Sequence, residues 1–281
     1  MSLNPIVSVL LPVHNADKYL VEAVKSVLNQ SYSFFELIIL DDGSTDSCTD
    51  FLVHFLDERI HLIKRKHNYI DTLNYGLSIA KGKFIARMDA DDKMFPNRLE
   101  EQVSILEADH NIKICASYMQ QMAGKDVYNS GLKGTIKPFA HFLLLGNIIA
   151  HPTVMFRTDY LRMNQLKYRQ KYIYAEDYKL WAEFASLGAA LYIIPKPLLE
   201  YRTSENQVSC VHHQQQIETA NLIRNELLTF LIKKYSQKYT AHLKKLYKCL
   251  ALLNEEKLLD DEYIFYCYYQ IFSRLLDKDE H

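Results

Sequence analysis

Short apolar runs alternate with stretches of helical periodicity over about the first 200 residues, and this alternation predicts a mostly parallel sheet covered by helices. Residues 7–13 are the first apolar run and predict a buried strand. Between Tyr19 and Leu28, apolar residues recur at i, i+1, i+4, i+5, i+8 and i+9, so one face of a helix is apolar. The same patterns predict further strands at residues 35–40, 60–63, 84–88 and 114–119, and helices at residues 48–56, 72–80 and 96–108.

The second half of the chain continues this pattern and then changes character. A helix is predicted from Glu176 to Leu187, with Gly188 as its C-terminal cap. From about Val211 onward glycine and proline are absent, and apolar residues recur at helical spacing. We therefore predict a main domain at 1–210 and a helical C-terminal extension at 211–281. Strands are also predicted at residues 154–157, 190–194 and 198–201, and a loop or edge region at residues 125–138.

Composition narrows the class of protein. A chain of 281 residues with 48% hydrophobic and 24% charged residues can hold one large α/β domain and a smaller appendage. The net charge of −1 gives no overall basic field, so nucleic acid is not expected as a partner. Cysteines without CxxC spacing indicate free thiols in a reducing compartment. Since we find neither a leader pattern nor an apolar stretch of about 18 residues, we expect a soluble, cytoplasmic protein.

Three carboxylates follow one predicted strand directly. Asp89, Asp91 and Asp92 lie in the segment Arg87-Met88-Asp89-Ala90-Asp91-Asp92, which comes after an apolar run at residues 84–86. Buried parallel strands present their carboxyl ends to a ligand crevice. Carboxylates held close together repel one another unless a cation neutralises them, and oxygen ligands suit Mg²⁺ or Mn²⁺. This segment therefore predicts a metal site.

Two more groups of acids occur at the ends of predicted elements. Asp41 and Asp42 open an Asp-Asp-Gly-Ser-Thr-Asp run after the second strand, where a turn and helix cap would need only one small polar residue. Glu176 and Asp177 begin a predicted helix, where acids also favour the helix dipole. The polar segment from Tyr201-Arg202 to Ser209 could reach a diphosphate or lie on the surface.

Together, the motifs resemble those of family 2 glycosyltransferases with the GT-A fold, over residues 5–209. The resemblance implies a Rossmann-like, mostly parallel sheet flanked by helices. It also implies transfer of a sugar from a nucleotide-diphospho-sugar to an acceptor hydroxyl, usually with inversion at the anomeric carbon. Residues 1–120 would then bind the donor, and residues 121–210 would bind the acceptor. The motifs are Pro12-Val13-His14-Asn15 with Asp17, the Asp41–Asp46 run, Arg87–Asp92 with Pro96-Asn97-Arg98-Leu99 and Gln102, Glu176–Trp181, and Tyr201-Arg202.

The same resemblance implies roles for individual residues. Asp177 would be the catalytic base, and Glu176 would orient it. Asp91 would be the main ligand of Mn²⁺ or Mg²⁺, assisted by Asp89 or Asp92. Residues expected to bind the nucleotide-sugar are Pro12, Val13, His14, Asn15, Asp17, Asp41, Asp42, Asn68, Arg87, Asp89, Ala90, Asp91, Tyr201 and Arg202.

The sequence departs from the family pattern at several positions. His14 stands where tyrosine is common, and the glycine often found two residues after the motif asparagine is missing after Asn68. Ser204 stands where many relatives have a histidine near the metal, so either water or a histidine of the following helix, His212 or His213, would take that place. His151 resembles part of an acceptor-lining segment, although a loop histidine before a strand accounts for it equally well.

The implied partners are a UDP-sugar donor and a glycan or lipid-linked acceptor, in synthesis of a bacterial cell-surface polysaccharide or lipopolysaccharide. Two other functions stay open: a degenerate nucleotide-sugar binder, suggested by Ser204, and a sugar nucleotidyltransferase, whose glycine-rich phosphate loop is absent from residues 11–15. The C-terminal aromatic residues are expected to form a helix core. Alternatively, they form a homodimer contact or a patch at the membrane surface, assisted by nearby lysines. These aromatic residues are Tyr263, Phe265, Tyr266, Tyr268, Tyr269 and Phe272, and the lysines are Lys233, Lys234, Lys238, Lys244 and Lys245.

Overall fold

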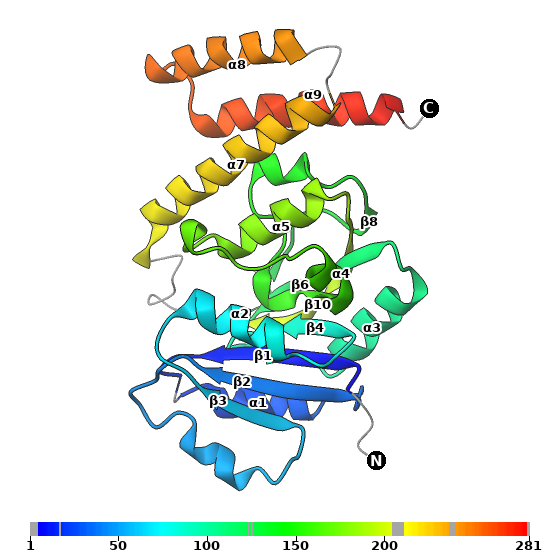
Figure 1. The fold of residues 1–281 in the computed structure, drawn as a ribbon, viewed down its shortest axis with the longest axis vertical. Helices are drawn as coiled ribbons and strands as arrows, with labels where there is room; N and C mark the ends of the chain where they lie inside the picture. The colour runs from blue at the N-terminus through cyan, green and yellow to red at the C-terminus, as the bar shows by residue number, and fades with distance from the viewer. Residues whose placement is uncertain are drawn as a thin grey trace.

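One mixed sheet with helices on both faces organises the chain, as the alternation of apolar runs and helical stretches predicts (Figure 1). The computed structural model describes residues 5–16, 18–122, 124, 126–203, 211–235 and 240–279. The strand order is β3-β2-β1-β4-β9-β6-β10-β5, with β7 paired to β6 and β8 paired to β10. The strands are β1 (Val7–Val13), β2 (Phe35–Asp41), β3 (Ile60–Lys64), β4 (Phe84–Arg87), β5 (Lys93–Met94), β6 (Ile112–Gln121), β7 (Val127–Tyr128), β8 (Gly134–Ile136), β9 (Met155–Arg157) and β10 (Ala190–Tyr201).

The parallel half of the sheet brings three of the predicted motifs to one edge. Strands β3, β2, β1 and β4 all run in the same direction, so their carboxyl ends meet there. In this register Val13 of β1 lies beside Asp41 of β2, and Leu10 lies beside Arg87 of β4. Strand β9 then runs antiparallel between β4 and β6. The His14, Asp42 and Asp89 segments therefore leave the sheet at neighbouring points.

Alternating side chains of the strands divide the interior into two layers. Leu10 and Ile38 belong to the layer that packs against α2 and α5, whereas Val9 and Leu11 belong to the layer that packs against α1 and α3. The continuous burial of β1 and β2 follows from helices on both faces. The helices are α1 (Leu20–Leu28), α2 (Tyr69–Ile79), α3 (Arg98–Ala108), α4 (Thr158–Met163), α5 (Glu176–Ser186), α7 (His213–Tyr235), α8 (Thr240–Glu255) and α9 (Asp261–Asp279), with 3₁₀ turns η1 (Asp50–His54), η2 (Phe142–Leu145), η3 (His151–Thr153) and η4 (Gln170–Tyr172).

Some predicted elements differ in length or number from the observed ones. The strands expected at residues 190–194 and 198–201 are one strand, β10, whose register shifts near Pro197. Proline removes a ladder hydrogen bond without forcing the chain out of an extended conformation, so the strand bulges and continues. The helix expected at 48–56 is only the short η1, in which Leu52 is the one buried apolar side chain. The region at 125–138 contains the edge strands β7 and β8.

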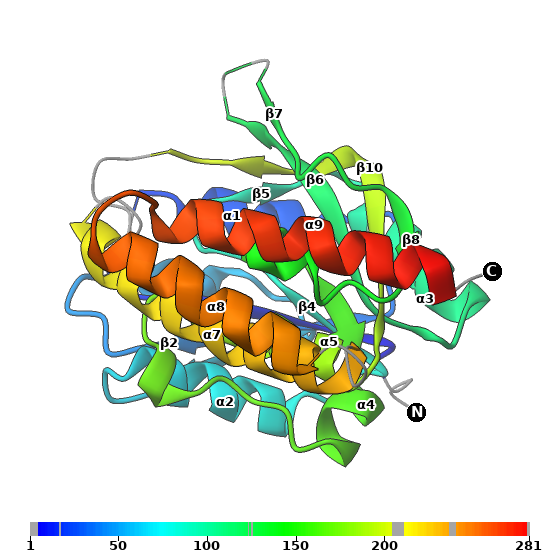
Figure 2. The ribbon, with the colours of Figure 1, turned by 90° about the horizontal axis from the view of Figure 1, so that it is seen from above.

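The C-terminal region is helical, as predicted, and packs on α5. Helices α8 and α9 lie side by side over α7 (Figure 2), and α7 contacts α5. Trp181 of α5, Leu227 of α7 and Phe272 of α9 belong to one hydrophobic cluster. Of the aromatic run, Phe265, Tyr268 and Phe272 are buried in this core, whereas Tyr263 and Tyr266 are exposed. Among the described residues, we find no helix with the length and apolar character needed to cross a bilayer.

Candidate active site

The acidic turn after β4 is held in place by an arginine from the far end of β10. The Arg202 backbone N–H donates to Asp92 Oδ1 at 2.9 Å, and Arg202 Nε donates to the Asp91 carbonyl oxygen at 3.0 Å. Asp92 is completely buried, whereas Asp89 and Asp91 are partly exposed. The turn therefore presents two carboxylates outward and uses the third to anchor itself.

Burial and mutual repulsion raise the pKa values of the carboxyl groups at this turn. Burial and the charge of Asp89 raise the pKa of Asp91 to about 6, and the same causes raise the pKa of Asp92. Asp92 Oδ2 is also buried without a hydrogen-bond partner among the described residues. Carboxyl groups with this much mutual repulsion become stable anions when a divalent ion binds between them.

Arg87 links the acidic turn to the start of α5. Its side chain is 4% exposed, forms an ion pair with Asp89 and donates from Nη2 to the Tyr69 hydroxyl at 2.8 Å. The positive charge of Arg87 also acts to lower the pKa of Asp91, Glu176 and Asp177, against the effect of burial. Acids that lie about 90 residues apart in the sequence are thus close enough to share one buried cation.

The two acids that begin α5 have different surroundings. Asp177 is partly exposed, and its carboxylate accepts from Asn147 Nδ2 at 2.8 Å and from the Tyr178 backbone N–H at 2.7 Å. Burial raises the pKa of Asp177, while these two donors oppose the rise. Glu176 is buried, and its Oε2 atom has no hydrogen-bond partner among the described residues. Asp177 is therefore the oriented, accessible carboxylate of the pair.

Replacing Glu176 by Gln is expected to stabilise the protein more at pH 8 than at pH 5. Burial and the charge of Asp177 raise the pKa of Glu176 to about 7, so the folded state holds a proton that the unfolded state releases above about pH 4.3. Stability therefore falls with rising pH up to about pH 7, and the loss is at most about 4 kcal/mol. Urea unfolding of both proteins at the two pH values, with chelator present, measures the difference. An equal effect at both pH values would show that Glu176 ionises normally.

The motif after β1 is tied to the turn after β2. Asn15 has φ +51°, and its Oδ1 atom accepts from the Thr45 backbone N–H at 2.8 Å. Asp41 Oδ1 accepts from the Ser44 backbone N–H at 2.9 Å, which closes the turn. Gly43 has φ +74°, and a Cβ at this position would lie 2.8 Å from the His67 backbone nitrogen, so only glycine fits. These contacts fix the turn after β2 against the segment that follows β1.

Asp42 connects this turn to the start of α2. Its Oδ1 atom accepts from the Asn68 backbone N–H at 2.8 Å and from Thr72 Oγ1 at 2.6 Å. The Asn68 side chain caps α2 by accepting from the Asp71 backbone N–H. The imidazole rings of His14 and His67 lie 4.4 Å apart beside Asp42. The structure thus groups His14, Asn15, Asp42 and Asn68.

The segment at residues 96–102, which follows the acidic turn, stabilises the fold beneath it. Arg98 is fully buried and donates from Nη2 to the Arg87 carbonyl oxygen at 2.8 Å. It also donates from Nε to Gln102 Oε1, and Gln102 in turn donates to the carbonyl oxygens of Cys115 and Thr153. This network ties the ends of β4, β6 and η3 together below the acidic turn.

Other predicted residues lie at the margins of this group or outside the described part of the chain. Asp17 and Ser204 are outside the described residues. His212 stacks on Tyr174 with ring centroids 4.1 Å apart. His151 is buried and shares a 2.8 Å hydrogen bond with the Tyr168 hydroxyl, and burial lowers its pKa well below the usual range. The remaining predicted positions are Pro12 and Val13, buried at the end of β1, Ala90 in the acidic turn, and Tyr201 at the end of β10.

Some residues around the site carry no sequence motif. Asn147 contacts Asp177, Tyr69 contacts Arg87 and Thr72 contacts Asp42. Thr72 and Tyr69 lie in α2, just after Asn68. Their closeness in sequence to this motif residue is a signal that could have identified them as part of the site. Asn147 lies 30 residues from its partner, in a segment of no recognisable pattern, and only the folded chain reveals it.

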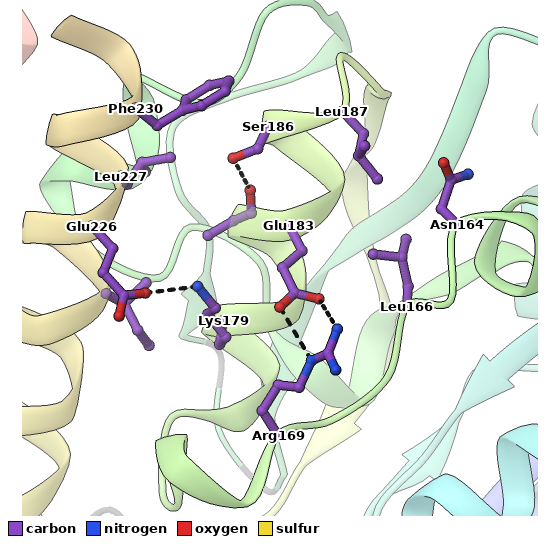
Figure 3. A pocket seen from close by; sticks show the side chains of 12 residues that line it. Asn164, Leu166, Arg169, Lys179, Glu183, Ser186, Leu187, Glu226, Leu227 and Phe230 are labelled. Atoms are coloured by element: carbon purple, nitrogen blue, oxygen red, sulfur yellow. Dashed lines mark hydrogen bonds and ion pairs between the residues drawn. The ribbon is translucent and has the colours of Figure 1, made fainter. Parts of the chain in front are cut away.

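A separate cavity of about 380 Å³ lies between α5 and α7 (Figure 3). None of the predicted site residues lines it. Arg169 pairs with Glu183 at 3.3 Å on one side, and Lys179 pairs with Glu226 at 2.7 Å on the other. The cavity is therefore a feature of the contact between α5 and the C-terminal helices, and it is distinct from the group around Arg87.

Comparison with known proteins agrees with this fold and site. Residues 8–172 match the family model described as Glycosyl transferase family 2. An uncharacterized glycosyltransferase of Haemophilus influenzae is 37% identical over 244 residues, covering 82% of this chain and 75% of that protein. The chain therefore belongs to family 2 of the glycosyltransferases.

A relative with a more specific name is the Escherichia coli UDP-Glc:alpha-D-GlcNAc-diphosphoundecaprenol beta-1,3-glucosyltransferase WfaP. It is 27% identical over 224 residues, covering 78% of this chain and 86% of WfaP. This relative is thus named for a glucose donor, UDP-Glc, and for a sugar acceptor linked to diphosphoundecaprenol.

Solved structures show the same fold. Staphylococcus aureus TarS residues 1–349 with UDP-GlcNAc aligns with a TM-score of 0.67 at 18% identity, covering 83% of this chain and 72% of that one. The chain spans 44% of a longer TarS structure. The Pyrobaculum calidifontis mannosyltransferase PcManGT with GDP-Man and Mn²⁺ aligns with a TM-score of 0.58 at 14% identity, covering 96% of this chain and 87% of that one. At these identities the likeness establishes the fold alone.

Proposed function

We propose that this chain is a metal-dependent, inverting glycosyltransferase that moves a sugar from a UDP-sugar to an acceptor hydroxyl. The observation that carries the proposal is the grouping around Arg87, which pairs with the partly exposed Asp89 and whose charge also acts on Asp91 and on the anchored carboxylate of Asp177. Displacement at a sugar carbon is assisted by a metal ion that stabilises the leaving group and by a general base that activates the acceptor hydroxyl, and these residues would supply both.

The donor would bind over the carboxyl ends of β1, β2 and β4. His14 offers a planar ring to the base, and Asp42 and Asn68 lie beside it. Asp91 and Asp89 would hold Mn²⁺ or Mg²⁺ and Asp92 would fix the turn, since only the first two are partly exposed. When bound, the ion supplies charge stabilisation for the departing diphosphate. Arg202, fixed against the acidic turn, adds positive charge near the same point.

Asp177 would act as the general base. Its carboxylate would take the proton of the acceptor hydroxyl as that oxygen attacks the anomeric carbon from the side opposite the diphosphate. Attack from that side inverts the configuration. The hydrogen bond from Asn147 holds one carboxylate oxygen of Asp177, and the buried, adjacent Glu176 would help to orient Asp177.

UDP as the nucleotide is supported by two similar proteins. WfaP is named as using UDP-Glc, and the TarS structure contains UDP-GlcNAc, although PcManGT contains GDP-Man and Mn²⁺. We propose that residues 1–120 bind the donor, that residues 121–210 face the acceptor and that residues 211–281 form an appended helical region.

We further propose a glycan or lipid-linked acceptor, reached from the cytoplasm at the inner face of the membrane. The WfaP name specifies a diphosphoundecaprenol-linked acceptor. Helices α7 and α8 expose Lys233, Lys234, Lys244 and Lys245, which would be attracted to anionic lipid. A homodimer contact is the alternative role for this region, because Tyr263 and Tyr266 are exposed.

Incubation with a panel of nucleotide-sugars and Mn²⁺ or Mg²⁺ tests the proposed function. We expect one donor to raise the thermal midpoint and to release its nucleoside diphosphate slowly, and we expect EDTA to abolish both effects. A metal-dependent midpoint shift without any release, even with acceptor glycans added, would indicate a nucleotide-sugar binder without transferase activity. No response to any donor would contradict the proposal.

A further inference from the structure

A group of two imidazoles and one carboxylate lies at the carboxyl ends of β1 and β2. His14, Asp42 and His67 each offer one ligand atom, and these three atoms lie within 4.8 Å of one another. Both histidines are exposed, whereas Asp42 is 1% exposed. We propose that His14, Asp42 and His67 bind a transition-metal ion of the Zn²⁺ class, at a site separate from the acidic turn.

The donor atoms already point at one small volume. The Nδ1 atoms of His14 and His67 each lie 3.0 Å from the Asp42 carbonyl oxygen. His67 Nδ1 also lies 2.9 Å from Asp42 Oδ2. Ligands of a tetrahedral zinc ion lie about 3.3 Å from one another, given Zn–N distances near 2.0–2.1 Å. Small rotations of two exposed rings therefore bring all three side chains to bonding distance.

One carboxylate oxygen of Asp42 faces the proposed site. Oδ1 accepts hydrogen bonds from Asn68 and Thr72, whereas Oδ2 is buried, makes no hydrogen bond among the described residues, and has the exposed His67 ring 2.9 Å away as its ion-pair partner. A metal ion bound by Oδ2 and by His67 would neutralise this buried oxygen in place of the exposed ring. The remaining bond from the ion would go to water or to the Asp42 carbonyl oxygen, which faces the same point.

Ligand chemistry separates this site from the acidic turn. Imidazole nitrogens suit zinc, copper, nickel and cobalt, whereas Mg²⁺ prefers oxygen ligands. The turn at Asp89 and Asp91 offers oxygen only. We expect the two sites to select different ions, so that Mg²⁺ in excess does not displace Zn²⁺ from the histidines.

A metal ion bound at this site would interfere with binding of the nucleotide-sugar donor. If the proposed function is right, His14 and Asp42 face the nucleotide base, so a metal ion there excludes the base. Zn²⁺ would then act as an inhibitor that competes with the uridine part of the donor, without touching the diphosphate end.

The test uses full-length protein without a polyhistidine tag, stripped of metal, and titrated with Zn²⁺ by calorimetry in excess Mg²⁺. The wild type is expected to bind one equivalent. His67→Gln and, independently, His14→Gln are expected to weaken binding at least about tenfold, since even outer-shell changes cost 10–100-fold in metal affinity. His61→Gln is the matched control, because His61 also lies near a buried carboxylate, Glu36 at 3.7 Å, but belongs to no group of three potential metal ligands among the described residues. Asp91→Ala should bind Zn²⁺ like the wild type.

Unchanged affinity in both His67→Gln and His14→Gln would overturn the site. Loss of binding in Asp91→Ala with retention in His67→Gln would place the ion at the acidic turn instead, and would also overturn it. Uridine, which lacks phosphates that chelate metal, then serves as the competitor: we expect Zn²⁺ to weaken its binding to the wild type but not to His67→Gln. If Zn²⁺ binds as expected while uridine does not bind at all, the metal site stands and the donor assignment fails.

Discussion

Asp177→Asn is expected to lower kcat by about 10²–10⁴-fold while donor affinity stays close to that of the wild type, because general-base assistance contributes a factor of this size. The amide has nearly the shape of the carboxylate but cannot take a proton. It keeps one of the two hydrogen bonds, from either Asn147 or the Tyr178 backbone, since an amide has a single acceptor oxygen. Steady-state rates with donor and acceptor, and calorimetry with donor alone, measure the two quantities.

Glu183→Gln is the matched control for Asp177→Asn. Glu183 also lies on α5, but it pairs with Arg169 and lines the cavity between α5 and α7 (Figure 3). We expect this variant to keep wild-type turnover. Turnover of Asp177→Asn at the wild-type rate would remove Asp177 from the mechanism, and equal losses in both variants would point to damage to the helix.

Asp91→Ala is expected to abolish the gain in donor affinity that Mn²⁺ or Mg²⁺ provides, a loss of at least about tenfold. The side chain is partly exposed and takes no part in holding the turn, because Arg202 contacts the Asp91 backbone carbonyl and the Asp92 side chain. The variant should therefore fold normally and lose only the cation. Calorimetry with the nucleoside diphosphate, in the presence of metal or of EDTA, gives the affinities.

Glu200→Gln is the control for Asp91→Ala. Glu200 is a partly exposed acid near the same end of β10, paired with Lys93 at 2.9 Å. We expect Glu200→Gln to keep the gain in donor affinity that the metal ion provides. A metal-dependent gain in Asp91→Ala equal to that of the wild type would refute the proposed role of Asp91.

The order of strands and helices follows well from the sequence, because burial on both faces leaves nearly continuous apolar runs such as Val7–Val13. The positions of the acids at the strand ends are predicted equally well, because each group directly follows one of these apolar runs. Their partners are not, since Arg202 reaches Asp92 across 110 residues and Asn147 reaches Asp177 across 30. The bulged course of β10 past Pro197 also depends on its neighbour β6, which a local pattern does not contain.

Packing of the C-terminal helices on α5 has a consequence for protein engineering. Glu226 of α7 binds Lys179 at 2.7 Å and the Tyr172 hydroxyl at 2.8 Å, and both partners belong to segments flanking Asp177. A chimera that exchanges residues 211–281 for the tail of a relative must therefore exchange the outer face of α5 and η4 with it. In a workable chimera, Lys179 and Tyr172 therefore come from the same parent protein as residues 211–281.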